Sequence, residues 1–309
     1  MNKAEETLAG IRNVVTRRGS HWLSETRLAL KIIRREISAL VGFTIILFFG
    51  LMATIGPELI PLSKLPDVGK RFLPPSWEYP LGTDFAGRDV LAQIVHGSRD
   101  VLLVAFFTGL ITVTIALSIG ISSGYIGGRA DSALMIIADI FLVIPSFPLL
   151  LVIAASLPRT LSPVEVAFVI SIVGWPGLTR AIRSQVLSVK EELYIESAKC
   201  LGLSKRHIIF REILPNLLPF IAMNLVLSII YAIYSQVGLY FLGVMPYTSV
   251  NWGTMINIAL YRQSALLNRK VWVYLFSPIV CIILIQMGFI LSLHVLEEIF
   301  NPRLRTEEA

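Results

Sequence analysis

The stretch "VLLVAFFTGLITVTIALSIGISSG", residues 101–124, contains 24 residues and no Asp, Glu, Lys or Arg. A helix that crosses about 30 Å of bilayer hydrocarbon needs about 20 mostly apolar residues. The stretch also lacks the period-2 alternation of a transmembrane β-strand. Because every backbone N–H and C=O must be hydrogen-bonded in lipid, it predicts a membrane-spanning helix.

Five further apolar segments extend this prediction along the chain. The shortest of them begins beside Glu165 and contains Pro176. The predicted spans in addition to 101–124 are 37–56, 132–157, 163–179, 217–245 and 271–293. The expected fold is therefore an all-α, polytopic membrane protein with six transmembrane helices.

The composition supports this class. The 309 residues are 55% hydrophobic and 16% charged, whereas a soluble domain carries about 25% charged residues. The net charge of +6 is spread along the chain rather than gathered in a basic patch with exposed aromatics, so a nucleic-acid partner is not expected. Cys200 and Cys281 fall in a polar loop and an apolar run, which indicates neither a disulfide framework nor a metal site.

Basic residues predict the orientation. The side that holds both termini carries 18 Lys and Arg residues and the other side carries 9, so the positive-inside rule places both termini in the cytoplasm of a cell-membrane protein. The predicted organisation is a cytoplasmic segment over 1–36, a six-helix domain over 37–300 and a cytoplasmic tail over 301–309. Within the domain we expect external loops over 57–99 and 246–270 and a cytoplasmic loop over 184–216.

The cytoplasmic loop contains "ELYIESAKCLGLSKRHIIFREILPNLLP", residues 192–219. Its first half has good helix formers, and Gly202 is a plausible residue to end that helix. Ser204 can cap a second short helix, and Pro215 disfavours helix at Leu214. The pattern predicts two amphipathic helices joined at a glycine elbow.

Two interpretations of this hairpin are open from its composition. It could lie along the lipid headgroups, as amphipathic helices often do. Alternatively, the small residues Ser197 and Ala198, on one stripe with Tyr194 and Leu201, would let another protein approach closely. The small residues favour a docking surface.

The cytoplasmic loop and three other segments resemble a known family. "ESA" from residue 196, Gly202 and "LP" from residue 214 resemble the "EAA…G…LP" loop of ABC importer permeases. Three blocks resemble the dipeptide/oligopeptide branch: "LGTDFAGRDVLAQIVHGSR" over 81–99, "IPSFPLLL" over 144–151 and "FLGVMPYTSVNWGTM" over 241–255. The likeness covers most of the chain.

The resemblance implies the fold of an ABC type I importer permease, of the C-type subunit. It implies a homologous second permease, two cytoplasmic ATPase subunits that bind ATP and Mg, and an extracytoplasmic solute-binding protein. The residues that it implies for ATPase coupling are Glu196, Ser197, Ala198, Gly202, Leu203, Ser204, Lys205, Arg206, Leu214 and Pro215.

The residues themselves indicate that ATP hydrolysis takes place elsewhere. The closest approach to a phosphate-binding loop, "DVGKRF" around Gly69 and Lys70, lacks the Ser or Thr after Lys. We expect a non-catalytic subunit without a cofactor.

The external block carries its own candidate residues, namely Gly82, Thr83, Asp84, Gly87, Arg88 and Asp89. Thr83 and Asp84 can cap a turn, and Asp89 can begin a helix with an apolar stripe, which we expect to lie flat on the outer membrane interface. Scaffolding is favoured over direct contact with a binding protein or solute.

Within the spans, the candidate pathway or gating residues are Asp139, Pro145, Pro148, Asn224 and Gln236. A charge at a helix centre costs about 2.5 to 3.5 kcal/mol on insertion scales, so Asp139 should face protein or water. A pair with a neighbouring helix is favoured over a solute contact. The two prolines predict a kink, and the amides are expected to bond other helices.

The substrate class is open. Gln236 stands where the peptide branch often has Glu, and the segment between Gly243 and Trp252 is short for that branch. These departures indicate a divergent branch, with an archaeal source as one alternative. Peptide is modestly favoured over di- or oligosaccharide.

Two other classes of protein are remote alternatives. An ion-coupled secondary transporter would usually show an inverted repeat. An intramembrane protease would need a metal motif, or a serine or aspartate pair at membrane depth.

Overall fold

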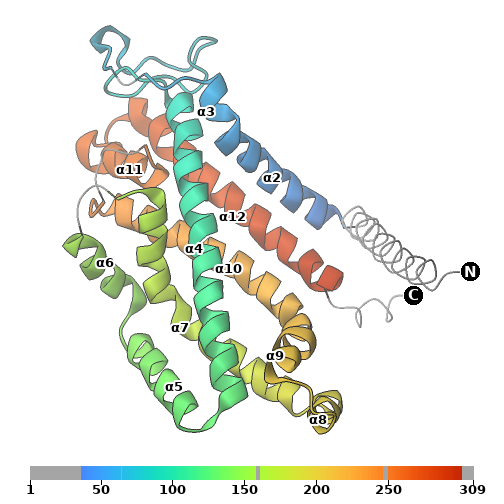
Figure 1. Cartoon of the computed structure of the whole chain (residues 1–309). Helices are drawn as coiled ribbons and strands as arrows, with labels where there is room; N and C mark the ends of the chain where they lie inside the picture. The colour runs from blue at the N-terminus through green and yellow to red at the C-terminus, as the bar shows by residue number, and fades with distance from the viewer. Residues whose placement is uncertain (1–35, 64, 158–160, 246–249, 301–309) are drawn as a thin grey trace, which may run out of the picture.

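The computed structural model describes residues 36–63, 65–157, 161–245 and 250–300, with side chains through residue 293. Its long helices run obliquely past one another, with the loop over 65–89 at one end and a helical hairpin at the other (Figure 1). We call these two ends external and cytoplasmic after the orientation that the basic residues predict. These helices are α2 (Ile37–Thr54), α4 (Val90–Ile126), α7 (Pro163–Lys190), α10 (Leu214–Phe241) and α12 (Trp272–Phe300). The short external elements are α3 (Gly56–Leu59), η1 (Val68–Lys70), α11 (Trp252–Asn257), η3 (Ile258–Arg262) and η4 (Arg269–Val271).

The remaining predicted span is broken. The helices α5 (Gly128–Val143) and α6 (Ser146–Ser156) meet at an angle of 88°. Pro145 is the N-cap of α6 and Pro148 lies in its first turn, where the missing N–H has no partner to lose. The predicted kink is confirmed. Among the described residues, five helices and this bent pair are long and apolar enough to provide the six predicted spans.

Two predictions about helix extent were wrong. The span predicted over 163–179 continues to Lys190 in α7. It continues because it packs on α4, where a Cβ on Gly120 would lie 2.9 Å from Ile182. The helix that begins after Asp89 does not lie apart on the membrane interface, but is the first part of the 37-residue helix α4. Gly97 lies inside this helix and makes room for the Trp252 ring, which is 2.9 Å from where a Cβ would lie.

The buried side chains form three clusters. One contains Trp252 and Phe49, and a second joins α4, α6 and α7 around Ile170. The cytoplasmic cluster joins the lower ends of α4, α7 and α10 to the hairpin, and consists of Ala116, Ile182, Val186, Ile195, Ala198, Ile208, Ile213 and Leu217. The hairpin is therefore part of the hydrophobic core.

Candidate functional site

The cytoplasmic hairpin turns at Gly202. Its first arm, α8 (Leu193–Cys200), ends where Gly202 adopts a φ of 74°. The N–H of Leu203 donates to the C=O of Ala198 at 3.2 Å, and the N–H of Gly202 donates to the C=O of Lys199 at 3.0 Å. This is the Schellman pattern, in which a left-handed glycine closes a helix end. The predicted glycine elbow is present.

The second arm begins at Ser204, whose Oγ accepts from the N–H of His207 at 3.3 Å. It comprises α9 (Lys205–His207) and the π-helical turn η2 (Ile208–Ile213), and passes directly into α10. The predicted interruption at Leu214 is therefore wrong. Pro215 has no N–H and its ring crowds the carbonyl one turn earlier, and the wider π-helical turn ahead of it accommodates that ring.

Ala198 does not have the surroundings that the docking interpretation assumed. It is 7% exposed and packs within the cytoplasmic cluster of this chain. The small residue lets the hairpin's own second arm approach, so its size says nothing about a partner. Ser197 is exposed, and its hydroxyl donates to the C=O of Leu193 at 2.9 Å.

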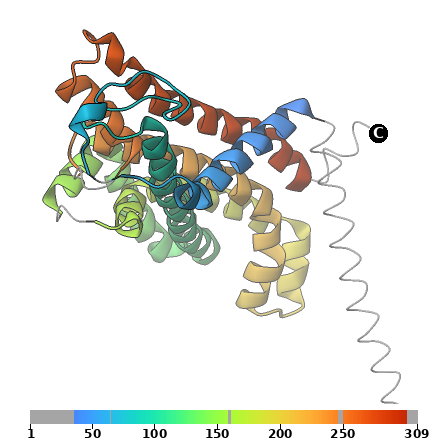
Figure 2. The same ribbon diagram turned by 90° about the horizontal axis from the view of Figure 1, so that it is seen from above.

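The outer surface of the hairpin is both apolar and basic. Leu193 and Leu201 are each 78% exposed and Phe210 is 63% exposed. The residues Gly202, Leu203, Ser204, Lys205 and Arg206 are exposed at the turn between the two arms, and Glu196 is exposed on α8. Figure 2 shows the two arms side by side and projecting from the bundle. We call the surface of Leu193, Leu201, Leu203 and Phe210 the hairpin tip.

An ion-pair cluster lies where α4, α5 and α7 meet, near the hairpin. Arg183 donates from Nε and Nη2 to the two carboxylate oxygens of Asp131, each at 2.6 Å. Ser123 donates to the same carboxylate, and Lys190 donates to the C=O of Tyr125 at 2.9 Å. Sequence reasoning missed this cluster, although the signal was present in opposite charges at the ends of predicted spans.

The external block is built around Asp84, which is 1% exposed. Its carboxylate accepts from Arg88 Nε at 3.0 Å and Nη2 at 2.9 Å, and from Gln93 Nε2 at 3.1 Å. It also accepts from two backbone N–H groups, those of Ala86 at 2.8 Å and Arg88 at 2.9 Å. Every one of these bonds is internal, as scaffolding requires.

The neighbouring residues of the block form turns, hydrogen bonds and a helix cap within the chain. Gly82 and Gly87 have φ values of 73° and 76°. Thr83 accepts from the N–H of Leu73 at 2.8 Å. Asp89 caps α4 by accepting from the N–H of Leu91 at 2.8 Å, and burial raises the pKa of its carboxyl while this capping bond lowers it less.

The polar residues of the spans bond mainly within the chain. Asp139 on α5 forms an ion pair with Arg180 on α7, and the prediction that it pairs with a neighbouring helix is confirmed. Gln236 is buried and donates to the C=O of Val101 on α4 at 2.6 Å, also as predicted. Asn224 instead donates to the C=O of Phe220 on its own helix at 2.8 Å, and among the described residues it makes no hydrogen bond to another helix.

Comparison with known proteins assigns this architecture. The family described as "Binding-protein-dependent transport system inner membrane component" matches residues 116–306. The chain belongs to this family. The permease is 32% identical to the dipeptide transport system permease protein DppC of Bacillus subtilis (strain 168), over 92% of this chain and 87% of that protein.

Two further relatives agree in length. The permease is 34% identical to the DppC protein of Alkalihalophilus pseudofirmus over 92% of both chains. It is 29% identical to the oligopeptide transport system permease protein OppC of Mycobacterium tuberculosis (strain ATCC 25618 / H37Rv), over 86% of this chain and 91% of that one. The permease is therefore a multi-pass inner-membrane component of a binding-protein-dependent ABC importer, and is not itself catalytic.

Proposed function

We propose that the permease imports di- or oligopeptides as one of two homologous membrane subunits, with both termini in the cytoplasm. The peptide-transport names of relatives that match almost the whole chain support the substrate class. The excess of Lys and Arg on the side of the termini supports the orientation. The remaining partners are two ABC ATPase subunits, which bind ATP and Mg, and a solute-binding protein.

The hairpin is the proposed contact with an ATPase subunit. The observation that carries this proposal is that its tip is exposed while its base is in the core of α4, α7 and α10. A force on Leu201 is therefore transmitted to three helices through close packing, which deforms little. Moving a population from 1:99 to 99:1 needs about 5.5 kcal/mol of differential binding between two states. We expect the ATPase contact to supply energy of that order.

Two substitutions distinguish the role of the exposed hairpin tip from that of the buried cluster beneath it. Leu201→Ser removes an apolar contact from the tip without touching the core, so it should leave thermal unfolding unchanged and reduce both ATPase copurification and ATP-driven uptake in proteoliposomes. Ala198→Trp overfills the buried cluster and should lower the unfolding temperature. Normal copurification and uptake in a folded Leu201→Ser variant would contradict the proposal.

The broken span is the proposed moving part of the pathway. The side chains of Asp139 and Arg180 are 47% and 55% exposed in the isolated chain. Because a charge facing hydrocarbon costs a few kcal/mol, this face must look toward water or the second permease. The bend at Pro145 and Pro148 lets α5 move relative to α6, which makes this face a gate.

The substrate class is tested by uptake in proteoliposomes that hold the complete transporter. Labelled dipeptide should accumulate with ATP and be displaced by unlabelled di- and tripeptides. Displacement by maltose or cellobiose and not by peptides would establish the saccharide alternative while leaving the importer assignment intact.

A further inference from the structure

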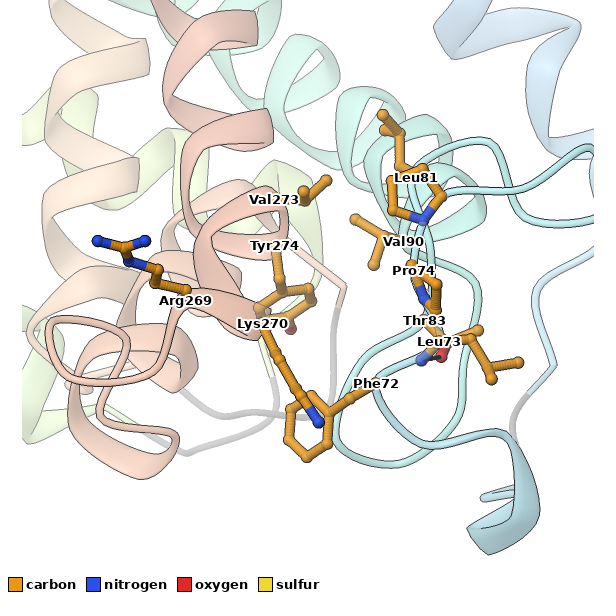
Figure 3. A pocket seen from close by; sticks show the side chains of 11 residues that line it. Phe72, Leu73, Pro74, Leu81, Thr83, Val90, Arg269, Lys270, Val273 and Tyr274 are labelled. Atoms are coloured by element: carbon orange, nitrogen blue, oxygen red, sulfur yellow. Dashed lines mark hydrogen bonds between the residues drawn. The ribbon is translucent and has the colours of Figure 1, made fainter.

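A cavity of about 370 Å³ lies on the external side of the permease, between the loop that precedes α4 and the start of α12. Figure 3 shows its walls, which are mostly apolar. Pro74 and Leu81 line it from the loop, Val90 from α4 and Val273 from α12. Such a lining favours the hydrocarbon part of a ligand.

The polar atoms beneath the cavity are already bonded. The hydroxyl of Tyr274 donates to Gln93 Oε1 at 3.3 Å, and Tyr274 is 3% exposed. The hydroxyl of Thr83 accepts from the N–H of Leu73 at 2.8 Å. A ligand therefore finds apolar contacts inside the cavity and finds its charged partners at the rim.

The rim carries positive charge. Arg269 and Lys270 both line the cavity, and no Asp or Glu does. Neither cation has a carboxylate within ion-pair distance in the part of the chain that the structure describes. The Arg269 guanidinium lies 5.6 Å from the centre of the Trp272 ring, and Lys270 points toward Phe72 (Figure 3). Both charges are available to an anion.

The cavity lies at the outer edge of the lipid headgroup region. The apolar helix α2 ends at Thr54, and Gly56 just beyond it faces Val95 of α4, whose Cγ1 would be 2.6 Å from a Cβ there. Val90, in the cavity wall, precedes Val95 by five residues, which is about 7 to 8 Å along a helix. The headgroup region extends about 5 to 7 Å beyond the hydrocarbon in each leaflet.

The segment next to the two cations has a lipid-facing composition. Leu266 and Leu267 are 80% and 91% exposed, and Trp272 is the kind of residue that anchors a helix at the membrane interface. Exposed leucines suit the hydrocarbon chains of a lipid, and the two neighbouring cations suit its anionic headgroup.

We propose that this cavity binds an anionic phospholipid of the outer leaflet. Lys270 and Arg269 contact its phosphate, while the apolar wall of Pro74, Leu81 and Val273 covers the glycerol and the first methylenes. Inorganic phosphate offers the same charge without the apolar part, so it would use the rim alone and bind more weakly.

The test counts lipids on the intact transporter. The full-length permease with its partner subunits is placed in phosphatidylcholine nanodiscs that contain graded phosphatidylglycerol, and retained lipid is measured by native mass spectrometry. Each interfacial basic residue contributes about 1 kcal/mol toward anionic lipid, which is about fivefold in affinity. Lys270→Gln should weaken retention about fivefold, and Lys270→Gln with Arg269→Gln about 25-fold. Arg129→Gln removes the same charge at the exposed start of α5, outside the cavity, and should weaken retention less than Lys270→Gln does, because no apolar cavity wall holds a lipid there.

The outcomes separate the sources of the anion. Protection from thermal unfolding by phosphatidylglycerol but not by millimolar inorganic phosphate supports the proposal. Equal protection by phosphate means an anion site without lipid recognition and overturns it. Unchanged lipid retention in the double variant overturns it as well. If the variants lose only the binding of the solute-binding protein, the rim is a protein docking site and the lipid assignment is wrong.

Discussion

Asp139 on α5 and Arg180 on α7 form an ion pair, with 3.4 Å between Oδ1 and Nη1. Ala138 is the one residue of α5 whose side chain is buried, so little core packing holds this helix in place. Contacts between its other side chains and α7 therefore matter more. The pair sits five residues before the bend between α5 and α6, and the rings of Phe141 and Trp175 meet 5.7 Å apart beside it. It is therefore placed to restrain the movement of α5 that we propose for the pathway.

A double-mutant cycle measures this tie. Asp139→Asn should lower the unfolding temperature in nanodiscs because it leaves Arg180 without its partner, and Arg180→Gln should act likewise. The double variant should be more stable than the sum of the two losses predicts, with a coupling of about 1 kcal/mol. A coupling near zero would mean that water screens the pair, as happens for surface ion pairs.

The elbow at Gly202 depends on a left-handed backbone. Gly202→Ala should destabilise the permease by about 1 kcal/mol, because a Cβ is strained at a φ of 74°. Thermal unfolding measures the loss. Gly50→Ala is the matched control, since Gly50 lies inside α2 with nothing within 4 Å of an added Cβ. It should be neutral or slightly stabilising, and equal losses in the two variants would contradict the elbow argument.

Asp84 should be the most sensitive acid of the external loop. Asp84→Asn places an amide N–H₂ against the donors of Arg88 and Gln93, which should cost about 3 kcal/mol. Unfolding by denaturant, followed in detergent, measures this. Asp67→Asn makes the same change in the same loop at an exposed cap, where Asp67 Oδ1 accepts from the N–H of Gly69 at 3.0 Å. Asn caps equally well, so that control should change stability by less than about 0.5 kcal/mol.

Asp89 should give the stability a pH dependence of its own. Burial raises the pKa of its carboxyl above the ordinary value of 3.8 in the folded state, so the folded protein binds the proton more tightly than the unfolded chain does. Its contribution to stability therefore falls as the pH rises from 3.8 through the folded pKa. Asp89→Asn keeps the cap and removes the titration. The variant should be more stable than wild type at pH 7, with a difference that vanishes near pH 4, and a constant difference across that range would contradict the assignment.

The amino-acid sequence determined the local features of this protein. The number of spans follows from apolar length, because hydrocarbon thickness sets how many residues a helix needs. The elbow at Gly202, the caps at Ser204 and Asp89 and the kink at Pro145 follow from backbone chemistry within one or two turns, which neighbouring residues alone control.

Only the tertiary structure decided which side chains meet. Asp131 and Arg183 are 52 residues apart and Gln93 and Tyr274 are 181 apart, so no local pattern could pair them. Ala198 appeared suited to a partner protein, yet packing turned it into the hairpin's own core. Burial depends on which helices the fold brings together, and the same small or charged residue serves a core, a gate or a surface according to that arrangement.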